Sequence, residues 1–152
     1  MTATIDDITN ARLVTLDLEA GDRWEAIEAL AGLLEADGRV SDRATFVEAA
    51  RAREGETGGT GMESGIAIPH AKSPAVTRAS VAFGRAPDPI GFGDADADLI
   101  FLIAAPEGED DLHVKILSRL ARRLIHEDFR SALRRAESPE QVIDIMREEV
   151  EL

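Results

Sequence analysis

The sequence of 152 residues contains no cysteine, no tyrosine and only two lysines. The absence of cysteine excludes disulfides, thiolate nucleophiles and cysteine-based zinc sites, and it fits an intracellular compartment. No apolar run approaches the roughly 20 residues that a membrane-spanning helix needs, and Met1 to Asn10 is acidic and polar, unlike a secretory signal. We therefore expect a cytoplasmic protein without direct membrane insertion.

Positive charge is also scarce, because 30 acidic residues face 17 basic ones and leave a formal net charge of −13. Nucleic-acid binding draws most of its free energy from Lys and Arg that neutralise phosphates, so DNA and RNA are poor partners. So acidic a composition with so few lysines resembles that of proteins from salt-loving organisms, in which molar salt screens the self-repulsion. An ordinary acidic cytoplasmic protein remains the alternative.

The hydropathy pattern predicts one domain over residues 1–152, since a chain of this length with 44% hydrophobic residues can bury a core. The expected strands cover 11–18, 80–85 and 99–104, and the expected helices cover 22–38, 42–53 and 112–124, followed by two closing helices. The stretch 99–105 is apolar throughout, which is typical of a strand covered on both faces. We predict an α/β fold, a three-layer α/β/α sandwich on a mixed β-sheet.

Glycines and prolines surround His70. The segment 55–61 is rich in glycine, while Pro69 and Pro74 can continue neither a helix nor a central strand, so we expect the imidazole on a constrained turn. Backbone N–H groups near such glycines can approach an anion, and neutral imidazole is a good nucleophile whose phosphoramidate passes its phosphoryl group on. The pattern favours phosphate chemistry, with a turn histidine of no chemical role as the alternative.

A second histidine, His113, is expected near the start of the helix over 112–124, after an acidic loop that ends in an N-cap at Asp111. Helical phase aligns it with the apolar residues Leu117, Leu120 and Leu124, so it should point inward. From the residues alone, a core-edge histidine bonded to a carbonyl is the alternative. His126 lies about 220° further round the helix and is expected on the surface.

The run Gly65-Ile66-Ala67-Ile68-Pro69-His70 resembles the signature of the IIA domain of the fructose and mannitol type of the bacterial phosphotransferase system. The likeness extends to Arg53-Glu54, Thr60-Gly61, residues 99–106 and His113, and so covers most of the chain. It implies that His70 accepts a phosphoryl group from the phosphocarrier HPr and passes it to a IIB component. That component is linked to a membrane IIC permease for fructose or a related sugar. We expect neither a cofactor nor a metal.

The same resemblance implies roles for further residues. His113 would assist the transfer, Arg53 would hold the phosphoryl group, and phosphate-binding contacts would come from Thr60, Gly65 and Pro69. Between Arg53 and His70 the chain has one residue more than the family usually has, which makes Arg51 the alternative to Arg53. Both arginines are expected in the last turn of their helix, where cations are favoured even without a function.

Three other functions fit parts of the pattern. A regulatory IIA paralogue of the nitrogen type would use the same histidine chemistry with another partner, and it remains the main alternative. A metal-dependent hydrolase is disfavoured, because no HExxH or HxH spacing appears. The cytoplasmic domain of an anion exchanger would share the fold without needing the histidine signature.

Overall fold

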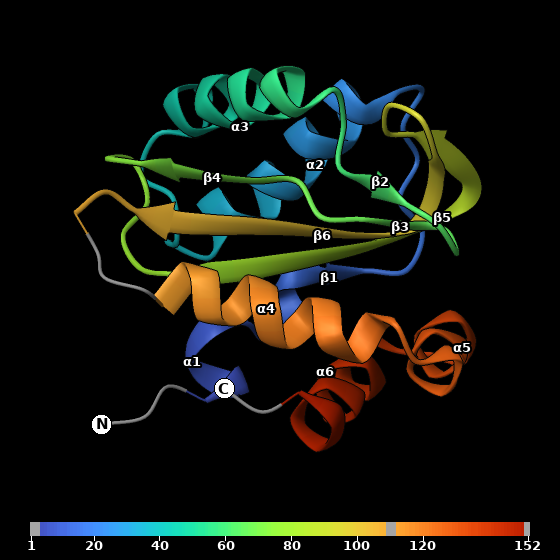
Figure 1. The fold of residues 1–152 in the computed structure, drawn as a ribbon. Helices are drawn as coiled ribbons and strands as arrows, with labels where there is room; N and C mark the ends of the chain where they lie inside the picture. The colour runs from blue at the N-terminus through green and yellow to red at the C-terminus, as the bar shows by residue number, and fades with distance from the viewer. Residues whose placement is uncertain (1–3, 109–111, 151–152) are drawn as a thin grey trace.

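A computed structural model describes residues 4–108 and 112–150 (Figure 1). The first half of the chain contains α1 (Ile5–Ile8), η1 (Ala11–Leu13), β1 (Val14–Thr15), α2 (Arg23–Ala36), α3 (Arg43–Thr57), β2 (Gly61–Met62), β3 (Ile66–Ala67) and β4 (His70–Ser73). The second half contains β5 (Ser80–Gly91), β6 (Asp96–Pro106), α4 (Leu112–Leu124), α5 (Glu127–Arg135) and α6 (Pro139–Glu149). Across both described ranges, every helix is too short or too polar to cross a bilayer.

Six strands of the described chain form one mixed sheet in the order β1-β5-β6-β3-β2, with β4 also paired to β6. β5 runs antiparallel to β6, whereas β3 and β4 run parallel to it. α2 and α3 cover one face of the sheet, and α1, α4, α5 and α6 cover the other (Figure 1). This arrangement confirms the predicted α/β/α sandwich.

β6 forms the centre of both cores. All side chains from Leu99 to Ala105 are buried. Leu99, Phe101 and Ile103 belong to the core under α4 to α6, and Ile100 and Leu102 to the core under α2 and α3. The prediction of a strand covered on both faces is therefore confirmed. Burial of each large aliphatic or aromatic side chain contributes about 1.5–3 kcal/mol to the stability of the fold. β6 is therefore a rigid part of the sheet.

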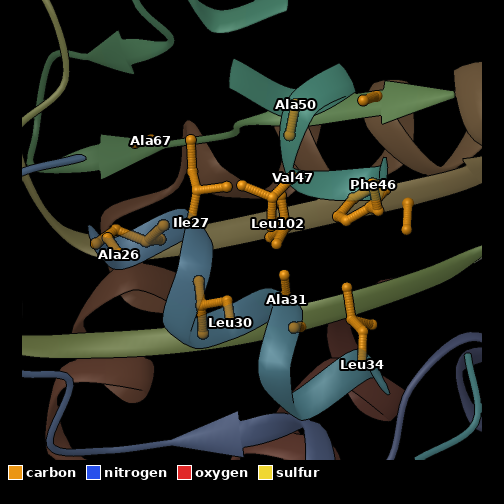
Figure 2. Packing of buried hydrophobic residues seen from close by; sticks show 14 of the residues in the cluster. Ala26, Ile27, Leu30, Ala31, Leu34, Phe46, Val47, Ala50, Ala67 and Leu102 are labelled. Carbon is orange, nitrogen blue, oxygen red and sulfur yellow. The ribbon is translucent and has the colours of Figure 1, made fainter. Parts of the chain in front are cut away.

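α2 and α3 pack against each other over the sheet, and α3 lies above β4. Asp22 caps α2 and Asp42 caps α3, each accepting a hydrogen bond from a backbone N–H three residues later, as expected from the sequence. Figure 2 shows the shared core, in which side chains of both helices lie over the sheet residues Ala67 and Leu102. Trp24 packs partly buried at the edge of this core.

In the first half of the chain, the predicted bounds of one strand and one helix are wrong. The strand expected over 11–18 shrinks to β1, because η1, capped by the side chain of Asn10, occupies its first residues. The helix expected to end at Arg53 continues through Gly55 to Thr57 and is capped by Gly58, which has a left-handed φ of 77°. A single helical glycine costs only about 1 kcal/mol, which the hydrogen bonds from Thr60 to Glu54 and the cap at Gly58 offset. Arg51 and Arg53 consequently lie before the last turn.

The segment between the strands expected over 80–85 and 99–104 was expected to be a loop, but it is largely strand. β5 continues to Gly91, and β6 already begins at Asp96, so only four residues separate them. The prolines at 87 and 89 fall in a register shift between Arg85 and Ile90, beyond the residues that pair with β1. Proline lacks a donor but is tolerated at a bulge of this kind, which explains the longer strand.

Candidate functional site

A cleft of about 520 Å³ opens where α3, β4, the last part of β6 and the start of α4 meet. The described residues that line the cleft combine apolar side chains with four polar ones. These residues are Ala49, Ala52, Arg53, Glu56, His70, Ala71, Lys72, Ile103, Ala105, Val114 and Leu117. The predicted nucleophile His70 therefore lies in a cleft that residues from four separate elements assemble.

The ring of His70 is held in one tautomer by the backbone. Its Nδ1 lies 2.9 Å from the carbonyl oxygen of Ile68. A carbonyl can only accept a hydrogen bond, so Nδ1 carries the proton and donates it. In the neutral ring the lone pair then resides on Nε2, to which no described residue hydrogen-bonds. Nε2 is thus the ring atom available for nucleophilic attack.

The backbone around His70 is fixed by β6. Ile66 pairs with Leu99 and His70 with Ile103 at the same offset, so β3 and β4 form one parallel strand interrupted at Pro69. Proline has no N–H to donate at this break, but its carbonyl accepts a hydrogen bond from Ile103 N at 3.0 Å. The expected constrained turn is wrong, because His70 is the first residue of a strand.

Arg53 reaches this cleft from α3, whereas Arg51 is engaged elsewhere. The Arg53 side chain is 52% exposed, and its Nη1 lies 3.8 Å from Glu56 Oε2. The guanidinium carbon of Arg51 lies 5.3 Å from the centre of the Trp24 ring, and Arg51 is absent from the described lining of the cleft. The longer helix accommodates the residues after Arg53 while keeping that side chain in the lining of the cleft that holds His70, so geometry favours Arg53 over Arg51.

Thr60 is bound by a buried carboxylate instead of facing the cleft. Glu54 is 1% exposed, and its two oxygens accept hydrogen bonds from Thr60 N at 2.9 Å and Thr60 Oγ1 at 2.8 Å. Arg23 Nη1 lies 3.5 Å from the same carboxylate. Gly61 N also has a partner, the carbonyl of Phe92 at 3.0 Å. Thr60 N thus ties the glycine segment to α3, and Gly61 N ties it to the β5–β6 turn. Thr60 is not among the described residues that line the cleft.

At the end of the signature away from His70, close packing requires a glycine at position 65. Its φ is +80°, and a Cβ there would collide with Asp98 Oδ1 and lie 2.6 Å from Arg134 Nη2. Arg134 pairs with Asp98 through two hydrogen bonds of 2.8 and 2.9 Å and donates to the carbonyl of Ser64, itself at a left-handed φ of 74°. Among the described residues, neither Gly65 nor Pro69 lines the cleft. Both shape the strand that carries His70.

The two remaining histidines differ in what the structure describes. His113 occupies the first turn of α4, one residue before the cleft residue Val114, as predicted for the backbone. The orientation expected for its side chain and the N-cap expected at Asp111 lie outside the described residues. His126 is exposed at the start of α5, which confirms its surface position.

Sequence reasoning missed two charged residues of the cleft, Lys72 and Glu56. Lys72 follows His70 by two positions on β4, and strand alternation was the signal that would have found it. Glu56 was missed because the helix was expected to end before it. Together with Arg53 they place two cations and one carboxylate in the cleft that holds His70, an arrangement suited to a dianionic group. In the described ranges, no group of three metal-ligating side chains is placed to hold a metal.

The chain matches a known protein family over most of its length. The family profile described as phosphoenolpyruvate-dependent sugar phosphotransferase system, EIIA 2, matches residues 7–149. The fructose-specific EIIA component of Haloferax volcanii is 42% identical over 150 residues, which cover 97% of each chain. The fructose-specific EIIABC component of Bacillus subtilis is 36% identical over 145 residues, 93% of this chain but 23% of that protein.

Solved structures show the same fold. The nitrogen regulatory protein IIA-Ntr of Neisseria meningitidis superposes with a TM-score of 0.84 at 32% identity, covering 93% of this chain and 98% of that one. The complex of enzyme IIA-mannitol and phosphorylated enzyme IIB-mannitol from Escherichia coli gives a TM-score of 0.77 at 26% identity, covering 91% and 96%. The chain belongs to the EIIA 2 family of the phosphoenolpyruvate-dependent sugar phosphotransferase system, whose components are phosphotransferases of that relay.

Proposed function

We propose that residues 1–152 act as one phosphocarrier domain, which accepts a phosphoryl group on Nε2 of His70 from phospho-HPr and donates it to a IIB component. The observation that carries this proposal is the hydrogen bond from Nδ1 to the Ile68 carbonyl, which leaves the lone pair on Nε2. In the transfer, the bond from Nε2 to phosphorus forms while the donor's N–P bond breaks. The donor nitrogen regains its lone pair, and no metal or cofactor takes part.

The cleft supplies what phosphoryl transfer asks of a protein, namely alignment and positive charge near the equatorial oxygens. The β3–β4 strand fixes the ring, and Arg53 lies beside it with only a loose contact to Glu56. We assign Arg53 to the phosphoryl group in preference to Arg51. Thr60, Gly65 and Pro69 contribute by holding the backbone of the site, instead of by the direct phosphate contacts expected from the sequence.

We propose that His113 assists the transfer without being the acceptor, since its backbone lies in the turn of α4 that borders the cleft. Removing one aligned donor to a transition state typically slows a reaction by about 10²–10³. His113→Ala should therefore still take up phosphate, slowly, and pass it on slowly. Single-turnover transfer in both directions measures this, with His126→Ala as the matched control on the surface.

The central experiment labels the protein with phosphoenolpyruvate, Enzyme I and a cognate HPr. Wild type should gain one acid-labile, base-stable phosphate, and His70→Ala none. His126→Ala should label fully, and circular dichroism should show that all three proteins are folded. Full labelling of His70→Ala would contradict the assignment of the acceptor.

The physiological partner is the second part of the proposal. The relatives from H. volcanii and B. subtilis are fructose-specific, and a related structure is a complex with phosphorylated IIB, which together support sugar uptake. Transfer from the phosphorylated chain to a fructose-type IIB protein tests this. Stable labelling without any transfer to IIB would favour the regulatory role, which the likeness to IIA-Ntr keeps as the second candidate.

A further inference from the structure

Lys72 is placed on the same face of the strand as the nucleophile. Side chains alternate along a strand, so His70 and Lys72 project to one side of β4. Their pairing partners on β6, Ile103 and Ala105, also line the cleft, as does Ala71 between His70 and Lys72, so the cleft extends around this edge of the sheet and includes the face that carries His70 and Lys72. Lys72 is therefore a cleft residue by register as well as by its position in the lining.

The distance between the two residues suits a shared ligand. Two residues along a strand span about 6.6 Å, which a flexible four-carbon lysine stem can bridge. The ammonium group is thus able to meet an oxygen of a group bound at Nε2 of His70. Arg53 reaches the same cleft from α3, so the two cations would approach such a group from two layers of the fold.

No structural task for Lys72 appears within the described part of the chain. The ion pairs there involve other cations, and the one carboxylate in the described lining, Glu56, lies 3.8 Å from Arg53. Lys72 is exposed, and it is one of only two lysines in a chain of net charge −13. A dianionic phosphoryl group approaching so acidic a protein is repelled, and a cation inside the cleft offsets that repulsion locally.

We propose that Lys72 is a second phosphoryl-binding residue, whose ammonium group contacts the phosphoryl oxygens during transfer to His70 and in the phosphorylated state. This inference rests on the proposed function of His70. Lys72 keeps its proton throughout, while the bond from Nε2 to phosphorus forms and the donor's N–P bond breaks. It lowers the barrier by charge and makes no covalent bond.

The experiment compares Lys72→Ala and Lys72→Arg with Lys115→Ala, which removes the only other lysine, on α4. Single-turnover uptake should be about 10- to 100-fold slower in Lys72→Ala, the contribution of one charge-assisted hydrogen bond. Lys72→Arg, which keeps the charge, should recover most of that loss, and Lys115→Ala should stay within about twofold of wild type. Denaturant midpoints should be unchanged, since Lys72 is exposed and makes no described ion pair.

A small donor separates the phosphoryl group from the partner protein. With phosphoramidate in place of phospho-HPr, Lys72→Ala should show a similar loss, and its phosphorylated form should hydrolyse at an altered rate. A defect seen only with HPr would assign Lys72 to the partner interface and overturn the inference, as would a Lys72→Arg variant as slow as Lys72→Ala. If wild type fails to label at His70, the proposed function fails; if Lys72→Ala matches wild type, only this inference fails.

Discussion

Arg53 and Glu54 are neighbours on α3, but their charges lie in opposite surroundings. Both carboxylate oxygens of Glu54 are bonded to Thr60, and the residue is 1% exposed. Arg53 is half exposed in the cleft, with one loose contact to Glu56. The pair Asp98–Arg134 at the other end of the signature is partly exposed, but its hydrogen bonds also serve the fold, because they support the Ser64–Gly65 backbone.

The difference separates charges that build the site from charges available to a ligand. A buried charge is tolerated only when partners replace the water it has lost, so Glu54 is fully committed to the fold. Asp98 is committed through its hydrogen bonds with Arg134. Arg53 and Lys72 are exposed, so both side chains stay hydrated and mobile. Both are therefore available to bind a phosphoryl group that enters the cleft. Resemblance to a family signature groups these residues together, although only some of them line the cleft.

The largest expected effect is the loss of stability in Glu54→Ala. The substitution leaves the N–H and hydroxyl of Thr60 without their acceptor and removes hydrogen bonds to a charged group. We expect the free energy of unfolding to fall by about 3 kcal/mol in denaturant titrations. Glu48→Ala, at an exposed position of the same helix, should change it by less than about 0.5 kcal/mol. If both substitutions lowered the free energy of unfolding equally, the distinction between charges that hold the fold and charges available to a ligand would be wrong.

Gly65→Ala should have the next largest effect, because it adds a Cβ in the left-handed region against the Asp98–Arg134 pair. We expect a loss of about 2 kcal/mol in the free energy of unfolding. Gly55→Ala is the matched control within α3, where nothing lies within 4 Å of a new Cβ. It should stabilise by about 0.5–1 kcal/mol. If Gly65→Ala kept wild-type stability and lost only phosphorylation, Gly65 would belong with the ligand-binding residues.

Acid should weaken a third committed charge, Asp37. Burial opposes its ionisation, but hydrogen bonds from Asn10, Arg12 and Arg39 outweigh burial and lower the pKa of the carboxyl group. A lowered pKa stabilises the folded state above the ordinary aspartate pKa of about 3.9, and that stability is lost as the pH falls through the folded-state value.

The stability difference between wild type and Asp37→Asn should therefore be constant from pH 7 to about pH 5 and shrink below about pH 4. Chemical denaturation at a series of pH values measures this difference. Asp88→Asn, at an exposed position of β5, should show no such change. A difference that persisted undiminished at pH 3 would mean that packing of Asp37, and not its charge, provides the stability.

Glu56→Gln should give the smallest effect, and one on transfer instead of folding. Exposed ion pairs contribute less than about 1 kcal/mol, so freeing Arg53 should raise the equilibrium phosphorylation of His70 by about two- to fivefold. The gain should fade in molar KCl, which screens exposed charges. Glu48→Gln is the control of equal charge change. A decrease in phosphorylation would show that Glu56 positions Arg53 instead of competing with the phosphoryl group.

Local pattern was enough to predict the helix starts near Asp22 and Asp42 and the doubly covered strand β6, and it singled out His70, which the structure places in the cleft. Each of these depends on a few consecutive residues, through capping chemistry, periodicity or a short signature. The same local rules failed where other contacts overrode them. α3 passed through Gly55, where the hydrogen bonds from Thr60 to Glu54 and the cap at Gly58 offset a small propensity cost, and β5 accommodated prolines at the register shift between Arg85 and Ile90.

The sequence by itself determined the signature that makes His70 a candidate for phosphoryl transfer, while the tertiary structure decided which residues share its cleft. Glu54 and Thr60 are joined across a loop, Gly65 is explained by a pair formed with Arg134 of α5, and Lys72 joins His70 through register on β6. These relations link residues through strand pairing and helix packing across the chain. Spacing along one sequence carries no record of such contacts, because they form only when separate elements bury their apolar faces together.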